Sequence, residues 1–246
     1  MYNRPPFLSK NNREFSSVKL QTTIAKSSFR HSFRKSAVSV LAIVIGASVL
    51  GSAAGQEGAA AATAEGNADA GKTKSATCAA CHGPDGNSIA PDWPSLAGQH
   101  ASYIVRQLKA FKGGDRPDVT MKPFADMLSD QDMLDIAAYF STQKPTPKGA
   151  DPALVSLGQQ IYRGGVPERG VAACIACHGP GGHGNAVSAY PRIGGQHSAY
   201  VSNALHKYAS GDRRSDTEVN QMMRNVAALL LDDEIKALSS YVQGLN

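Results

Sequence analysis

Two copies of the pentapeptide Cys-x-x-Cys-His constrain this 246-residue chain more than any other feature. They span residues 78–82 and 174–178 and contain all four cysteines of the chain. This pentapeptide is the attachment signal for c-type haem, because its two thiols form thioethers with the haem vinyl groups and its imidazole is placed to bind the iron. The sequence therefore predicts two covalently bound haem c groups. The predicted attachment residues are Cys78, Cys81, Cys174 and Cys177, and the predicted proximal iron ligands are His82 and His178.

Zinc sites, thioredoxin-like centres and structural disulfides also use paired cysteines. The two pairs lie 96 residues apart, whereas zinc motifs separate their pairs by roughly 15–20 residues. A thioredoxin-like motif would follow a strand, and no β-rich run precedes either copy. Disulfides would not explain why His82 and His178 occupy the same offset, so haem attachment accounts best for all six residues.

Residues 1–54 have the pattern of an export signal, or signal peptide. A basic segment at 29–35 precedes an apolar run at 37–50, and small residues follow up to Ala54. We expect cleavage after Ala54, because the apolar run is shorter than the about 20 residues that span a membrane. A retained anchor is the alternative. Export predicts a periplasmic protein, soluble or loosely associated with the membrane, because c-type haem is attached outside the bacterial cytoplasm.

The basic character of the whole chain comes from this segment. The full sequence has a formal net charge of +5, but residues 55–246 carry 17 Lys and Arg against 19 Asp and Glu. We therefore expect no nucleic-acid partner. A slightly acidic surface favours transient docking to redox proteins, since complementary charge raises association rates.

The chain after the export segment is a tandem duplication. Cys78–His82 aligns with Cys174–His178 at a shift of 96, and Pro94–His100 aligns with Pro191–His197 at a shift of 97. The connecting residues 143–152 contain three prolines, which disfavour a helix and favour an extended linker. The predicted divisions are a flexible stretch at 55–70, a first domain at 71–142, the linker at 143–152 and a second domain at 153–246.

Each half has apolar residues at helical spacing. These stripes are Ile104, Leu108, Phe111 and Met133, Ile136, Phe140 in the first half, and Val201, Leu205, Tyr208 and Ile235, Leu238, Val242 in the second. We predict an all-α fold, repeated twice, with opening helices at 71–81 and 153–163. Ser129 with Asp132 predicts a capping box for the first closing helix, and Asp232 is the expected cap of the second.

An iron that only carries electrons needs a second axial ligand, and a thioether is the donor that raises its reduction potential. The methionines after residue 54 are Met121, Met127, Met133, Met222 and Met223. Met121 and Met223 each lie seven residues before matched leucines, so the repeat selects them as the sixth ligands. Met133 falls on an apolar stripe and is expected in the core, while Met222 stays the alternative for the second haem.

The remaining histidines are expected to have other roles. His100 and His197 are predicted at the surface or as helix caps, and His183 and His206 are predicted to be exposed. A proline carbonyl is expected to orient each proximal imidazole. The sequence leaves open whether Pro84 and Pro180 or Pro94 and Pro191 supply it.

The paired C-x-x-C-H halves, the P-x-[LI]-[AG]-G-Q-H segments, the G-D-R turns and the closing L-S-D-Q-D…A-A-Y-F helix resemble the di-haem cytochrome c4 family. The resemblance covers residues 66–246 and implies two class I cytochrome c domains related by a pseudo-twofold axis, with haem propionates facing each other. It also implies His–Met ligation by His82 with Met121 and by His178 with Met223. Its implied role is delivery of electrons to a terminal oxidase in the periplasm.

We therefore predict an electron-transfer protein of the respiratory chain and not an enzyme, because axial ligation at both irons leaves no open position. Its expected partners are a quinol-oxidising complex or another donor, and a terminal oxidase. One alternative is the haem-bearing subunit of a membrane dehydrogenase or oxidase. The other is a di-haem enzyme such as a peroxidase or thiosulfate-oxidising cytochrome, which would need a displaceable ligand.

Overall fold

The computed structural model describes residues 65–245, so the predicted export signal lies outside the described residues. Within that range the regular structure is helical apart from the isolated β-bridges Val166–Val171 and Asn185–Tyr190, which confirms the all-α prediction. The first half (residues 65–142) contains α1 (Ala68–Lys74), η1 (Ser75–Thr77), α2 (Ala79–His82), α3 (Ala101–Gly113), α4 (Met121–Asp126) and α5 (Asp130–Ser141). The second half (residues 152–245) contains α6 (Pro152–Gly164), η2 (Pro167–Arg169), α7 (Ile175–His178), α8 (Ser198–Ala209), η3 (Thr217–Val219), α9 (Met222–Ala227) and α10 (Asp232–Gln243).

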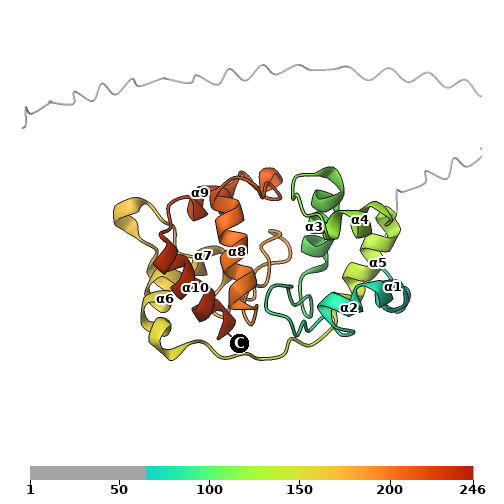
Figure 1. Cartoon of the computed structure of the whole chain (residues 1–246), viewed down its shortest axis with the longest axis horizontal. Helices are drawn as coiled ribbons and strands as arrows, with labels where there is room; N and C mark the ends of the chain where they lie inside the picture. Colours follow the sequence, from blue (N-terminus) through green and yellow to red (C-terminus); the bar gives the residue numbers. More distant parts are fainter. Residues whose placement is uncertain (1–64, 246) are drawn as a thin grey trace, which may run out of the picture. The chain divides into compact units, whose positions relative to one another are not determined.

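The opening and closing helices of each half pack against each other, α1 on α5 and α6 on α10 (Figure 1). A glycine stands at each crossing. A Cβ on Gly71 would lie 1.9 Å from the Asp135 carbonyl oxygen, and one on Gly158 would lie 2.4 Å from the Ala237 carbonyl oxygen. Because no side chain fits at such distances, glycine at both positions lets the helices approach backbone to backbone.

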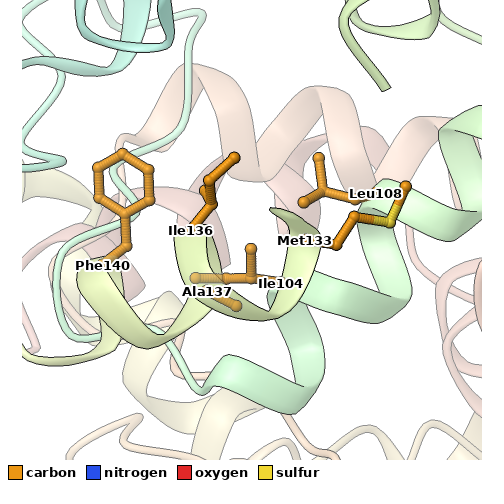
Figure 2. Packing of buried hydrophobic residues seen from close by; sticks show 6 residues of the cluster. All are labelled: Ile104, Leu108, Met133, Ile136, Ala137 and Phe140. Carbon is orange, nitrogen blue, oxygen red and sulfur yellow. The ribbon is translucent and has the colours of Figure 1, made fainter. Parts of the chain in front are cut away.

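The predicted apolar stripes form the two cores. In the first half, residues of α3 and α5 interleave, and Met133 is completely buried there as expected of core filler (Figure 2). In the second half, α6 and α10 contribute Ile161, Tyr162, Leu238 and Val242, all less than 4% exposed. Tyr208 is buried, whereas Val201 and Leu205 are only half-buried.

The helix predictions needed two corrections. The opening helix predicted at 71–81 is divided, because α1 ends at Lys74 and a 3₁₀ turn precedes α2. Ser75 Oγ donates to the Lys72 carbonyl at 3.1 Å, and such side-chain bonds compete with the α-helical ladder. Separating α1 from α2 leaves the haem motif on a helical turn of its own.

The second correction concerns the caps. Ser129 and Asp132 form the predicted capping box of α5. Asp232 does not cap α10, because it is the first helical residue and Leu231 precedes it as N-cap. The carboxylate of Glu234 accepts the Leu231 N–H at 2.9 Å, and Arg169 of η2 donates to the same carboxylate at 2.6 Å.

Candidate haem sites

The two motif histidines are buried at the ends of short helices. His82 ends α2 and His178 ends α7, and their exposed fractions are 6% and 7%. Each helix stops at a glycine with positive φ, +79° at Gly83 and +74° at Gly179. These turns let the following loops return across the imidazoles.

The returning loops supply the proline carbonyls that the sequence left open. His82 Nδ1 donates to the Pro94 oxygen at 2.8 Å, and His178 Nδ1 donates to the Pro191 oxygen at 3.0 Å. Pro84 is not the partner, since its carbonyl accepts from Tyr139 Oη at 2.8 Å. The later proline pair therefore orients both rings.

Burial lowers the pKa of both His82 and His178, although the hydrogen bonds to the proline carbonyls oppose this effect. Both imidazoles are thus neutral near pH 7. Because Nδ1 carries the proton and donates it, Nε2 keeps its lone pair. A neutral imidazole held in this tautomer is the form that binds a metal.

The four cysteines are free, half-buried thiols. Cys78 and Cys174 are the N-cap residues of α2 and α7, and Cys81 and Cys177 lie within these helices. Cys78 packs against the first core and Cys174 against the second. Burial raises the pKa of both thiols, that of Cys174 to about 11. Each half thus brings two thiols and a neutral imidazole to one helical turn, which is the donor set that covalent haem attachment requires.

The methionines chosen from the repeat lie near the start of short helices that correspond in the two halves. Met121 is the first residue of α4 and packs against the first core, and Met223 is the second residue of α9. Four residues after each comes a fully buried alanine, Ala125 and Ala227. This match supports pairing Met121 with Met223. The neighbouring Met222 has its sulfur 3.9 Å from Tyr190 Oη.

A cluster of arginines and tyrosines joins the two halves, and sequence reasoning missed it. Arg213 is 2% exposed and donates to Tyr103 Oη and Gln107 Oε1, each at 2.8 Å. Arg116 donates to Tyr200 Oη at 2.9 Å and to Gln107 Oε1 at 3.0 Å. Each arginine thus binds the tyrosine of the opposite half. The sequence did contain a signal for this cluster, because a tyrosine precedes the arginine of each G-D-R turn at the same spacing, Tyr103 before Arg116 and Tyr200 before Arg213.

The cluster is suited to binding carboxylate groups. Burial alone would raise the pKa of Tyr200, but the positive charges of Arg116 and Arg213 outweigh it and lower that pKa to about 8. Gln107 Nε2 is buried and has no hydrogen-bond partner within residues 65–245. Excess positive charge beside an unpaired amide donor fits the carboxylates of haem propionates.

The other histidines were predicted only in part. His183 and His206 are exposed as expected. His100 and His197 occupy N-cap positions, but neither side chain caps its helix. His100 Nε2 donates to the His183 carbonyl at 2.9 Å, and His197 Nε2 donates to the Ser88 carbonyl at 2.8 Å. The surface prediction was wrong for His197, which is 8% exposed, because the G-Q-H segments face the opposite half.

No helix in the range 65–245 has the length and apolar character needed to cross a membrane.

Comparisons with known proteins agree with this geometry. The family model described as cytochrome c matches residues 68–144 and again residues 155–246. Cytochrome c4 of Azotobacter vinelandii is 47% identical over 192 residues, which are 74% of this chain and 91% of that protein. The crystal structure of reduced recombinant cytochrome c4 from Pseudomonas stutzeri is similar with a TM-score of 0.72 at 46% identity, covering 74% of this chain and 100% of that one.

A more distant relative has a different name. The thiosulfate dehydrogenase electron acceptor of Stutzerimonas stutzeri (strain A1501) is 36% identical over 169 residues, which are 67% of this chain and 76% of that protein. The two matches to one family model, the duplicated haem motif and the covalent-attachment donor set agree on the cofactor, two covalently bound haem c groups. The chain belongs to the cytochrome c4 family, as a di-haem electron carrier with two cytochrome c domains in tandem.

Proposed function

We propose that Cys78 and Cys81 attach the first haem and that Cys174 and Cys177 attach the second. His82 with Met121 ligates the first iron, and His178 with Met223 ligates the second. The observation that carries this assignment is the pair of buried imidazoles, each neutral and each held through Nδ1 by a proline carbonyl. When bound, each haem supplies one-electron chemistry at its iron.

The residues of the chain would occupy the ligand positions of both irons and keep water away from the haems. The proline carbonyls fix the imidazole rings, the apolar cores exclude water, and the methionine thioethers favour the reduced iron. Irons held by a histidine and a methionine would have no open position for a substrate. We therefore propose a carrier of single electrons and not an enzyme.

We place the carrier in the periplasm, after export and cleavage at residue 54, between respiratory-chain components. The acidic balance after that residue, 17 basic against 19 acidic side chains, supports transient docking to redox partners. A terminal oxidase is the proposed acceptor and a quinol-oxidising complex the proposed donor. The relative named as a thiosulfate dehydrogenase electron acceptor favours a second candidate donor, an enzyme that oxidises thiosulfate.

Reoxidation by oxidase-bearing membranes tests the acceptor. The fully reduced protein, mixed with such membranes in air, should be oxidised at both haems, and cyanide should stop the reaction because it blocks the oxidase. Ferricyanide serves as the control that both haems can be oxidised. Oxidation that proceeds equally fast in cyanide, or that fails while ferricyanide still works, would exclude the terminal oxidase as acceptor.

A further inference from the structure

Two glutamines, one from each half, each bind a backbone segment of the opposite half. Gln196 Oε1 accepts the Ser95 N–H at 2.9 Å, and its Nε2 donates to the Ser95 carbonyl at 2.9 Å. Gln99 does the same to Arg192, at 2.9 Å from the N–H and 2.8 Å from the carbonyl. Both side chains are buried, with exposed fractions of 7% for Gln99 and 8% for Gln196.

The peptide groups they bind are the ones that orient the proximal histidines. The Ser95 N–H belongs to the same peptide unit as the Pro94 carbonyl, which accepts from His82 Nδ1 at 2.8 Å. One peptide unit therefore connects Gln196 of the second half to His82 of the first. The Pro191–Arg192 peptide connects Gln99 of the first half to His178 of the second in the same way.

Hydrogen bonds at the two ends of a peptide polarise each other. When the Ser95 N–H donates to Gln196, electron density moves toward the Pro94 oxygen, which becomes a stronger acceptor. A stronger acceptor draws more on the Nδ1–H and raises the basicity of the imidazole as a ligand. A more basic axial ligand stabilises Fe(III) over Fe(II), so the bond lowers the reduction potential of the haem that it reaches.

We propose that Gln196 and Gln99 are positioning residues that set the reduction potential of the haem in the opposite half. Gln196 acts on the haem of His82, and Gln99 acts on the haem of His178. This inference rests on the proposed function, because it takes these two histidines as iron ligands. Each half thus completes the ligand environment of the other, and contact between the halves becomes part of the redox tuning.

The test is a crossed pair of variants, Gln196→Met and Gln99→Met, in the intact di-haem protein. Methionine has a similar length but can neither accept from nor donate to the peptide as an amide does. Gln243→Met is the matched control, because Gln243 also accepts a backbone N–H (Ser198, 2.8 Å) and donates to a backbone carbonyl (Gly149, 2.7 Å), but neither group belongs to a peptide that orients a proximal histidine.

A haem-resolved redox titration by NMR should show an upward shift in the potential of the first haem in Gln196→Met and of the second haem in Gln99→Met. The haem in the mutated half should keep its potential, and Gln243→Met should shift neither. In the reduced, diamagnetic protein, the Nδ1–H resonance of His82 should move upfield in Gln196→Met, while that of His178 stays in place. A change that only loosens packing would not move one resonance selectively across the interface.

Three outcomes would overturn the proposal: no shift in either variant, a shift confined to the mutated half, or equal shifts at both haems. Failure of the proposed function would be visible separately, because the spectra of the wild-type protein would then lack the features of His–Met ligation. If Gln196→Met does not fold, Gln99→Met alone still tests the proposal, because the potential is then expected to shift at the haem of His178, in the half opposite to the mutation.

Discussion

Replacing Met223 by Ala is expected to remove about half of the weak Met-to-iron absorption band that His–Met haems show near the red edge of the oxidised spectrum. The thioether is the donor responsible for this band, so each haem contributes its own share. Met121→Ala should remove the other half, and the double variant should lose the band. The affected haem should also fall in reduction potential, because a soft ligand that favours Fe(II) has gone.

Met222→Ala is the matched control for this result. Met222 and Met223 are adjacent in α9 and both half-buried, but only Met223 corresponds to Met121 by its distance from the buried Ala227. Tyr190 Oη already lies 3.9 Å from the Met222 sulfur. The band should therefore survive Met222→Ala at full strength. Loss of half the band in Met222→Ala, with none lost in Met223→Ala, would transfer the ligand to Met222.

Arg213→Leu is expected to cause the largest loss of stability at the contact between the halves. It removes the hydrogen bonds that Arg213 donates to Tyr103 Oη, Gln107 Oε1 and Ser215 Oγ. It also removes the guanidinium that stacks on the Tyr208 ring, with 4.5 Å between its carbon and the ring centroid. Leaving buried polar groups unpaired costs about 1–3 kcal/mol each, so we expect about 3 kcal/mol in total. For a protein of this size that corresponds to a Tm lower by roughly 6–12 °C.

The neighbouring Arg214→Leu provides the control. Its side chain is 48% exposed, and among residues 65–245 its polar contacts are limited to the Gly114 carbonyl at 3.4 Å and Asp115 at 3.9 Å. Exposed ion pairs contribute about 0–1 kcal/mol, so thermal unfolding should change little. Calorimetry of the oxidised protein would compare the two variants. Equal Tm values for Arg213→Leu and the wild type would mean that the arginine–tyrosine cluster does not hold the halves together.

The elements that the sequence predicted best are those fixed by local spacing. The cysteines and histidines of the haem motif are adjacent in sequence, so their grouping on one helical turn needs no knowledge of the fold. The stripes through Met133 and Ile235 are set by helical periodicity and lie in the cores as expected. The repeat also matched Met121 with Met223, although ligation by either remains a prediction.

The features that the sequence did not predict depend on the paths of the loops, which bring residues distant in sequence into contact. Pro84 and Pro94 both follow His82, and only the path of the intervening loop decides which carbonyl meets the imidazole. The repeat shows that Gln99 corresponds to Gln196, but not that each faces the other half. Asp232 was wrong as a cap because the Glu234 carboxylate accepts the N–H of the N-cap residue instead, held there by Arg169 of η2, 65 residues earlier in the chain.

Carbon monoxide added to the fully reduced wild-type protein tests most directly the claim that both irons are closed by histidine and methionine. Carbon monoxide binds to reduced haem iron only where an axial position is open or its ligand is easily displaced. We predict that the Soret and visible bands stay unchanged at pH 7, with both haems remaining competent for oxidation by ferricyanide. A shifted Soret band corresponding to one or both haems would contradict the account, because it would show an iron position that histidine and methionine do not close.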